Sequence, residues 1–314
     1  MPSPRHFLPS SVRPATLGSA ARAGSDYGAS DRPDWREVRW RGHLRAVTVD
    51  GRRVHAVSIG AGTALPVLFV HGLGGRWQNW LENIPRLAAR RRVVAIDLPG
   101  FGRSQMPREA ISMAGYAAVV DRVCDLFELD RVALVASSMG GFIAAELALR
   151  HPHRLERIAL VSPVAAWMGD FDPGPATALL AALARTRLGT PAGIRAIIAR
   201  QRSRHLAFAT LVRHPTRIAP DILLELAGGQ GAAGLGGALA AMLSHDLRDQ
   251  LAEVAVPTLI VHGREDMIVP LADSIRLAQT LPSARLEIFE DTGHLAMVER
   301  PRRFNDALER FLDP

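Results

Sequence analysis

The stretch RVALVASSMGGFIAAELALR, residues 131–150, decides how this chain is expected to fold. It begins with apolar β-formers, and residues 142–150 that close it follow a helical pattern. Between them lie two serines, a methionine and two glycines. A strand that passes directly into a helix through such a turn lifts one serine hydroxyl above the sheet, over the first backbone amides of the helix. The pattern is that of a nucleophile elbow.

The sizes of the flanking residues decide which of the two adjacent serines is the predicted nucleophile. The residues two before and two after the exposed serine crowd each other across the turn, so both must be small. Ala136 and Gly140 flank Ser138 in this way, whereas a valine and a methionine would flank Ser137. Ser138 is therefore the predicted nucleophile, although the methyl group of Ala136 takes some of the clearance. Ordinary strand-to-helix turns also carry serines, so the rest of the chain must decide.

The chain has 314 residues, and 48% of them are apolar, which is enough to bury one large hydrophobic core. All 38 basic residues are arginine, which stays charged below about pH 12. The isoelectric point near 11.0 therefore overstates a formal net charge of only +7. Arginine clusters such as residues 90–92 have no interleaved aromatic residues, and we expect no nucleic-acid partner.

The single cysteine, Cys124, excludes an internal disulfide and a cysteine-rich metal site, and its helical surroundings predict a packing role. We expect neither a metal nor an organic cofactor. No apolar run reaches membrane-spanning length, so we expect no integral membrane segment and a cytoplasmic location. The first 25 residues contain arginines, serines and prolines but no acid before Asp26. This composition predicts a disordered or loosely docked arm, with a cleaved leader as the alternative.

The order of the apolar runs predicts an α/β fold. A hairpin is expected at residues 44–58, where Asp50 and Gly51 supply the turn. Short apolar runs typical of buried strands then alternate with helical stretches. The expected strands are 66–70, 92–96, 131–135, 157–161, 257–261 and 285–289, and the expected helices are 77–89, 116–129, 139–150, 271–281 and 302–312. The pattern predicts a mostly parallel central sheet with flanking helices, entered through an antiparallel hairpin.

One long segment interrupts this alternation. Residues 165–255 are mainly helical in pattern, rich in alanine, leucine and arginine, and broken by prolines and glycines. Because the segment lies between two expected strands, we predict an inserted helical cap. The predicted organisation is a flexible N-terminal arm at 1–35, a core at 36–164 and 256–314, and the cap at 165–255.

Residues that suggest chemistry follow the expected strands, and function collects at the carboxyl ends of strands in open parallel sheets. After the first parallel strand comes His71-Gly72-Leu73-Gly74-Gly75, whose glycines let backbone amides approach a ligand. The amides of Leu73 and Met139 are predicted to bind an oxyanion. The run lacks the Gly-Lys-Ser/Thr ending of a phosphate loop. We expect His71 to brace this loop and Asp97, after the next strand, to have a structural role.

Two later strands are followed by an acid and a histidine. Asp266, with Glu265 beside it, comes just after strand 257–261, and His294 lies in the turn after strand 285–289. A loop histidine alone carries little information in a chain that has 11 of them. The order is informative: serine, acid and histidine, each after its own strand, is the order in which this kind of sheet brings a catalytic triad together.

With these motifs in this order, the chain resembles the α/β-hydrolase superfamily, in its capped serine-hydrolase branch. The resemblance covers roughly residues 45–312, including the point where the cap is inserted. It implies that Ser138 is the nucleophile, that His294 is the general base and that Asp266 orients the imidazole. It also implies an oxyanion hole made by the amides of Leu73 and Met139.

The resemblance also favours Asp266 over Glu265. The family pattern places the acid three residues before the Val-Pro pair that opens the next helix, and here that pair is residues 269–270. Related haloalkane dehalogenases and epoxide hydrolases need an aspartate where Ser138 stands, which argues against both activities.

We therefore expect a serine hydrolase that cleaves small to medium hydrophobic carboxylic esters through an acyl-enzyme, with a small-molecule substrate. Of the two tryptophans after the glycine-rich loop, we expect one to line a pocket and one to pack a helix. The predicted pocket residues are Trp77, Trp80, Trp167 and Phe171, with Met168 and Phe208 as further cap residues. Three alternatives stay open: a carbon-carbon hydrolase of diketone ring-fission products, an acyl or peroxyacid transferase, and a non-catalytic binder, which the complete triad disfavours.

Overall fold

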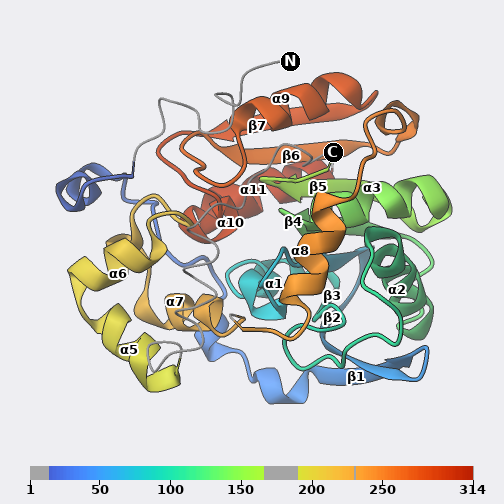
Figure 1. Ribbon diagram of the computed structural model, residues 1–314, viewed down its shortest axis with the longest axis horizontal. Helices are drawn as coiled ribbons and strands as arrows, with labels where there is room; N and C mark the ends of the chain where they lie inside the picture. Colours follow the sequence, from blue (N-terminus) through green and yellow to red (C-terminus); the bar gives the residue numbers. More distant parts are fainter. Residues whose placement is uncertain (1–13, 166–189, 230, 314) are drawn as a thin grey trace.

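A seven-stranded sheet forms the centre of the molecule (Figure 1). The computed structural model describes residues 14–165, 190–229 and 231–313. The strands are β1 (Leu44–Val49), β2 (Arg52–Val70), β3 (Arg91–Ile96), β4 (Val132–Ser137), β5 (Leu155–Val161), β6 (Thr258–Gly263) and β7 (Ala284–Phe289). From β2 through β4, β5 and β6 to β7 neighbouring strands are parallel, and β1 pairs antiparallel with β2. The predicted sheet and hairpin are confirmed.

The hairpin between β1 and β2 turns where Asp50 and Gly51 were expected to turn it. Both residues have positive φ angles, +49° and +70°, as a two-residue turn between twisted strands requires.

β2 differs from its prediction, because two expected strands are one long strand that passes around β3. Its later half runs parallel to β3, with Val67 opposite Val93. In its earlier half Ile59 lies opposite the same Val93, and successive residues of β2 pair with earlier residues of β3, as in an antiparallel pair. β3 therefore lies between the two halves. Gly60, with φ +83°, sits at the bend, where a Cβ would lie 2.3 Å from the Arg91 carbonyl oxygen. Only glycine fits this close passage.

Helices cover both faces of the sheet. They are α1 (Ile84–Ala88), α2 (Met113–Leu126), α3 (Gly140–Arg150), α5 (Pro191–Ala199), α6 (Gln201–Phe208), α7 (Pro220–Ala227), α8 (Leu235–Leu243), α9 (Leu271–Thr280), α10 (Ala296–Glu299) and α11 (Pro301–Leu312). Short 3-10 helices lie at Leu17–Arg22, Trp35–Glu37, Trp40–Gly42, Trp77–Trp80, Pro152–Arg154, Pro215–Arg217 and Leu251–Glu253. The helix expected at 77–89 is thus two short pieces.

Alternate residues of each strand point into two hydrophobic clusters, one on each face. Leu68 and Val70 of β2 pack with α2, α3 and α9, whereas Val67 and Phe69 pack with α1, α10 and α11. This is the period of two that a strand buried on both faces must show. The arrangement leaves the carboxyl ends of the parallel strands as the edge where loops gather.

The helices between β5 and β6 divide over the two clusters. In Figure 1, α5, α6 and α7 gather at one side of the molecule, and α8 runs apart from them, near α2. Side chains of α5, α6 and α7 join one hydrophobic cluster, and Ala238 and Met242 of α8 join the other. These helices lie within the predicted cap, of which residues 166–189 and 230 are outside the described part of the chain.

The described part of the N-terminal arm packs against the rest of the molecule. Tyr27 is 2% exposed and belongs to the hydrophobic core. Asp31 pairs with Arg86 of α1 at 2.9 Å, and just beyond the arm Arg36 pairs with Asp221 of α7 at 2.6 Å. An aromatic anchor and ion pairs to distant segments hold residues 14–35 against the molecule.

No helix in the described ranges is both long and apolar enough to cross a membrane.

Trp80 tests how the core is built. It is fully buried, with its ring 4.7 Å from that of Phe69 and 6.5 Å from that of Phe304, centroid to centroid. We expect Trp80→Ala to lower the free energy of unfolding, measured with urea, by about 3–5 kcal/mol, because a large cavity remains. Leu206→Ala, at a side chain 81% exposed, is the control and should change it by less than about 0.5 kcal/mol. Unchanged stability with a raised KM for esters would instead place Trp80 in a pocket wall.

Candidate active site

Ser138 lies in the turn between β4 and α3. Its φ angle is +51°, in the left-handed region that strains residues other than glycine. Its N–H donates to the Val161 carbonyl at 3.0 Å, and its own carbonyl accepts from the amides of Gly141 at 2.8 Å and Val164 at 2.9 Å. Ser138 is partly exposed, whereas Ser137 is buried. The structure thus has the strained, outward-facing serine that the sequence pattern suggested.

Small residues pack on both sides of this turn. A Cβ on Gly140 would lie 3.0 Å from the Cβ of Ala136, so positions 136 and 140 do face each other across the elbow. A Cβ on Gly72 would lie 2.9 Å from the Cβ of Ser138, which shows how closely the loop after β2 approaches it. The two serines therefore differ in the way the steric argument required.

Asp266 follows β6 and His294 follows β7, so two neighbouring strands bring them together. Nδ1 of His294 lies 2.8 Å from Oδ2 of Asp266, and both residues are buried. An ionised carboxylate only accepts hydrogen bonds, so the imidazole carries its proton on Nδ1 and donates it to Asp266. This tautomer leaves Nε2 as the atom that can accept a proton.

Asp266 is held as an anion. Its Oδ1 accepts from the amides of Ile268 at 2.8 Å and Val269 at 3.0 Å, and His262 Nε2 lies 3.4 Å from Oδ2. Burial by itself raises the pKa of Asp266. Attraction to His294, with its hydrogen bond, and the weaker effects of His262 and the Val269 amide outweigh burial and lower that pKa below its usual value.

Glu265, the rival acid, has a different partner. Its Oε2 accepts from the Thr292 amide at 2.9 Å, and its own N–H donates to the Thr292 carbonyl at 2.9 Å. Glu265 therefore ties the turn after β6 to the turn after β7 through the backbone. Of the two adjacent acids, it is Asp266 that hydrogen-bonds to His294.

His71 braces the loop after β2, as predicted. Its Nδ1–H donates to the Gly72 carbonyl at 2.7 Å, and its Nε2 accepts from the Leu98 amide at 3.0 Å. Burial lowers the pKa of His71, in agreement with the neutral ring that this pair of bonds requires.

Of the two amides predicted to bind an oxyanion, one belongs to the elbow and the other to the loop that approaches it. Met139 immediately follows Ser138, and Leu73 follows Gly72. Neither amide donates a hydrogen bond to another group within the part of the chain that the structure describes.

A model of the α/β-hydrolase fold matches residues 66–219 and 221–301. The chain belongs to the α/β-hydrolase family. The match includes the elbow and both turns that carry Asp266 and His294.

Three similar proteins illustrate the range of this hydrolase's relatives. The 2-hydroxy-6-oxo-2,4-heptadienoate hydrolase of Pseudomonas putida is 30% identical over 297 residues, which cover 85% of this chain and 95% of the relative. The dihydrolipoyllysine-residue acetyltransferase component of the acetoin cleaving system of Cupriavidus necator is 34% identical over 265 residues, covering 84% and 67%. A solved structure described as Est816, an N-acyl homoserine lactone degrading enzyme, has a TM-score of 0.68 and 27% identity, covering 85% and 100%.

The other residues that the sequence singled out lie in a loop, in a cavity lining and in the hydrophobic core. Asp97 has the structural role expected of it, since its two oxygens accept from the amides of Trp77 and Arg103, each at 2.9 Å. Trp77 lines a cavity together with Trp40, His55 and other residues, and Ser138 is not part of that lining. Trp80 and Phe208 are buried in the core.

Two predicted pocket residues, Trp167 and Phe171, and the further cap residue Met168 lie outside the described residues. Within the described residues, no group of three or more His, Cys, Asp or Glu side chains is arranged to hold a metal ion.

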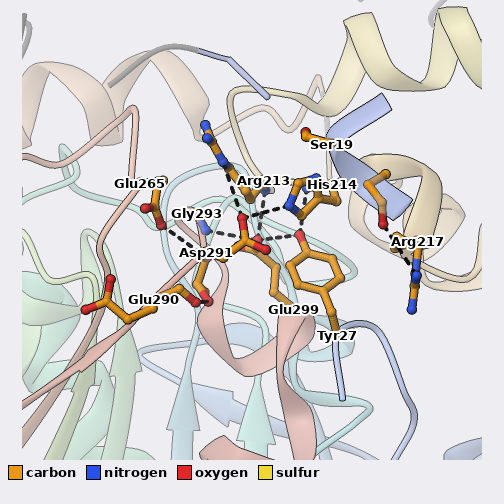
Figure 2. Close-up of polar contacts among 12 residues, drawn as sticks. Ser19, Tyr27, Arg213, His214, Arg217, Glu265, Glu290, Asp291, Gly293 and Glu299 are labelled. Atoms are coloured by element: carbon orange, nitrogen blue, oxygen red, sulfur yellow. Dashed lines mark hydrogen bonds and ion pairs between the residues drawn. The ribbon is translucent and has the colours of Figure 1, made fainter. Parts of the chain in front are cut away.

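Sequence reasoning missed a buried acid close to His294. Glu299 is fully buried, and its carboxylate accepts hydrogen bonds from the amides of Gly293 and Leu295, the residues before and after the histidine. Figure 2 shows the contact with Gly293. Local sequence gave no signal for it, because a glutamate is almost never fully buried unless it is paired, and its partner Tyr27 lies far away along the chain.

The acid gives a direct test of this geometry. We expect Asp266→Asn to fold normally and to lose roughly four orders of magnitude in turnover, because the amide favours the wrong imidazole tautomer. Glu265→Gln keeps an oxygen to accept from the Thr292 amide, so its turnover should stay close to that of the unmodified protein. The measurement is kcat with an activated ester and circular dichroism on each variant. The reverse ranking would show that Glu265 is the acid that serves His294.

Proposed function

We propose that this α/β-hydrolase cleaves carboxylic esters of small to medium hydrophobic acyl groups, with Ser138, His294 and Asp266 as its catalytic triad. The observation that carries the proposal is the buried hydrogen bond between His294 and Asp266, at the edge of the sheet where Ser138 occupies a strained turn. This combination supplies a nucleophile, a base in a defined tautomer and an anion that stabilises the protonated base.

In the first half of the reaction, Ser138 Oγ attacks the acyl carbonyl carbon and its proton passes to His294 Nε2. Asp266 stabilises the imidazolium that forms. The amides of Leu73 and Met139 donate to the carbonyl oxygen as it becomes negative. The tetrahedral intermediate then collapses, the bond to the leaving oxygen breaks, and the alcohol takes the proton from His294.

In the second half, water resolves the ester formed on Ser138. His294 removes a proton from the water as it attacks the acyl carbon, and the same amides stabilise the second oxyanion. Collapse releases the carboxylic acid and returns the proton to Ser138. No step needs a group beyond substrate, water and these residues.

Two further activities are supported by the names of relatives. The Pseudomonas putida relative is named as a hydrolase of a diketone-type acid, whose carbon-carbon bond the same constellation of residues would have to break with protonation at carbon. The Cupriavidus necator relative is named as an acetyltransferase component, in which an acceptor would replace water. The structural neighbour is described as degrading an N-acyl homoserine lactone, a substrate class that contains a cyclic ester, and this agrees with the proposed ester reaction.

The segment at 165–255 has a proposed role as the cap that shapes the acyl pocket. Its described helices approach the glycine-rich loop, where a Cβ on Gly229 would lie 2.0 Å from the Gly74 carbonyl oxygen. Trp167 and Phe171 remain proposed pocket walls, whereas the cavity that Trp77 lines does not include Ser138.

The nucleophile is tested by removing each serine separately. We expect Ser138→Ala to reduce turnover by up to about a millionfold, because the covalent route is lost, and Ser137→Ala to have a mild effect. Fluorophosphonate labelling followed by peptide mapping checks the site of attack. A label on Ser137, or labelling that survives in the Ser138→Ala protein, would contradict the assignment.

The substrate class is tested with chromogenic esters of graded acyl length and one ring-fission diketone. We expect the best ester to exceed the diketone in kcat/KM by at least about tenfold, the discrimination that pocket contacts commonly supply. Diketone cleavage that is faster than every ester, and that Ser138→Ala abolishes, would replace ester hydrolysis by carbon-carbon hydrolysis.

A further inference from the structure

A buried carboxylate lies behind the backbone that carries His294. Glu299 ends α10 and has no exposed surface. Its oxygens accept four hydrogen bonds, all from uncharged donors, as Figure 2 shows in part. Oε2 accepts from the Tyr27 hydroxyl at 2.6 Å, the Arg213 amide at 2.8 Å and the Gly293 amide at 2.9 Å, and Oε1 accepts from the Leu295 amide at 3.2 Å.

Two of these donors are the amides on either side of His294. Because one carboxylate binds both, it restrains the backbone one residue before His294 and one residue after it. The remaining amide, that of His294 itself, donates to the Leu211 carbonyl at 3.1 Å. The carboxylate packs closely against this turn, since a Cβ on Gly293 would lie 3.1 Å from Oε1 of Glu299. A displacement of about 1 Å at a catalytic group can lower a rate about a hundredfold, so this restraint bears on chemistry.

The N-terminal segment holds the carboxylate from the other side. The Tyr27 hydroxyl donates to Glu299 and accepts from the His214 amide at 2.7 Å, so its hydrogen bonds are directed. The Tyr27 ring meets the His214 ring edge to face at 5.1 Å between centroids. The Gly28 amide donates to the Glu299 carbonyl at 2.7 Å. Both the side chain and the backbone of Glu299 are therefore anchored by residues far away in the sequence.

We propose that Glu299, anchored by Tyr27 and by the Arg213 amide, is a positioning residue that holds His294 in the orientation needed for proton transfer. The inference rests on the proposed function of His294 as general base. It assigns the N-terminal segment and the loop at 211–214 a part in turnover, although neither touches the substrate in the proposed reaction. The device works through the backbone of the turn after β7.

Charges around Glu299 are paired with each other and leave its carboxylate to neutral donors. Asp291 Oδ1 lies 2.8 Å from His214 Nε2 and 3.7 Å from Arg213 Nε, and Arg300 pairs with Asp26 at 2.7 Å. Burial raises the pKa of Tyr27 well above its usual value, so it stays a donor.

The protonation state of Glu299 should make the restraint on His294 depend on pH. Burial raises the pKa of Glu299 to about 7, against the opposing effect of its donors. Since every partner donates, the ionised form fits the site, and a proton on either oxygen would face a donor. As pH falls through about 7, protonation therefore loosens the turn that carries His294, and the restraint is complete only above that pH.

Tyr27→Phe is the discriminating variant, and Tyr116→Phe is its matched control. Tyr116 is also buried, and its hydroxyl donates to the Pro99 carbonyl at 3.0 Å, in the cluster on the other face of the sheet. For a small activated ester we expect Tyr27→Phe to lower kcat about tenfold with little change in KM. The acidic limb of the pH-rate profile of this variant should move to higher pH. The reason is that the charged form of Glu299 loses a hydrogen-bond donor, which raises the pKa of Glu299. Tyr116→Phe should leave both readouts unchanged.

Glu299→Gln is the second variant. It places an NH2 group among donors, and we expect a larger fall in kcat than in Tyr27→Phe. Because glutamine does not titrate, the acidic limb of the pH-rate profile should no longer contain the ionisation of residue 299. If Tyr27→Phe and Glu299→Gln kept the kcat and pH profile of the unmodified protein while losing only thermal stability, the positioning role would be wrong. Fluorophosphonate labelling separates the two proposals: an unmodified protein that does not label at Ser138 contradicts the proposed function and what rests on it. Equal labelling rates for the unmodified and Tyr27→Phe proteins contradict the positioning role alone.

Discussion

The hydrogen bond between His294 and Asp266 is the interaction on which the arrangement of this edge of the sheet depends. It is short, buried and directed, and it joins the turns after β6 and β7. The other carboxylate oxygen of Asp266 is held by two backbone amides, so the acid cannot rotate away. Glu265 and Glu299 act on the same turn through its backbone. Three carboxylates thus determine where one imidazole lies.

Several features could be predicted from sequence because their causes are local. The elbow follows from small residues on both sides of Ser138, and the structure brings positions 136 and 140 into contact. The hairpin follows from the Asp-Gly turn at residues 50–51. The parallel sheet follows from the alternation of apolar runs with helical stretches. Choosing Asp266 over Glu265 required the resemblance to a family, since local pattern alone does not distinguish adjacent acids.

What escaped prediction depends on contacts between distant segments. Tyr27 and Glu299 are 272 positions apart, and no periodicity connects them. The arginines, serines and prolines of the N-terminal arm predicted a disordered or loosely docked segment and gave no sign that one aromatic side chain and ion pairs would hold its described part. The bend of β2 around β3 depends on Gly60, whose role becomes visible only when the Arg91 carbonyl lies against it. Trp80 was assigned by its neighbours in sequence, whereas its neighbours in space are Phe69 and Phe304.

The burial of Glu299 sets the stability of the fold against turnover as pH changes. Its pKa is about 7 in the folded protein against a usual 4.5, so the folded chain binds this proton more tightly than the unfolded chain does. The stability that the group contributes is complete below about pH 4.5 and is lost as pH rises through 7, where its ionisation costs about 3 kcal/mol. The same ionised form holds the histidine turn. Raising the pH through 7 therefore weakens the fold and strengthens the restraint on the histidine turn, so stability and turnover depend on pH in opposite directions.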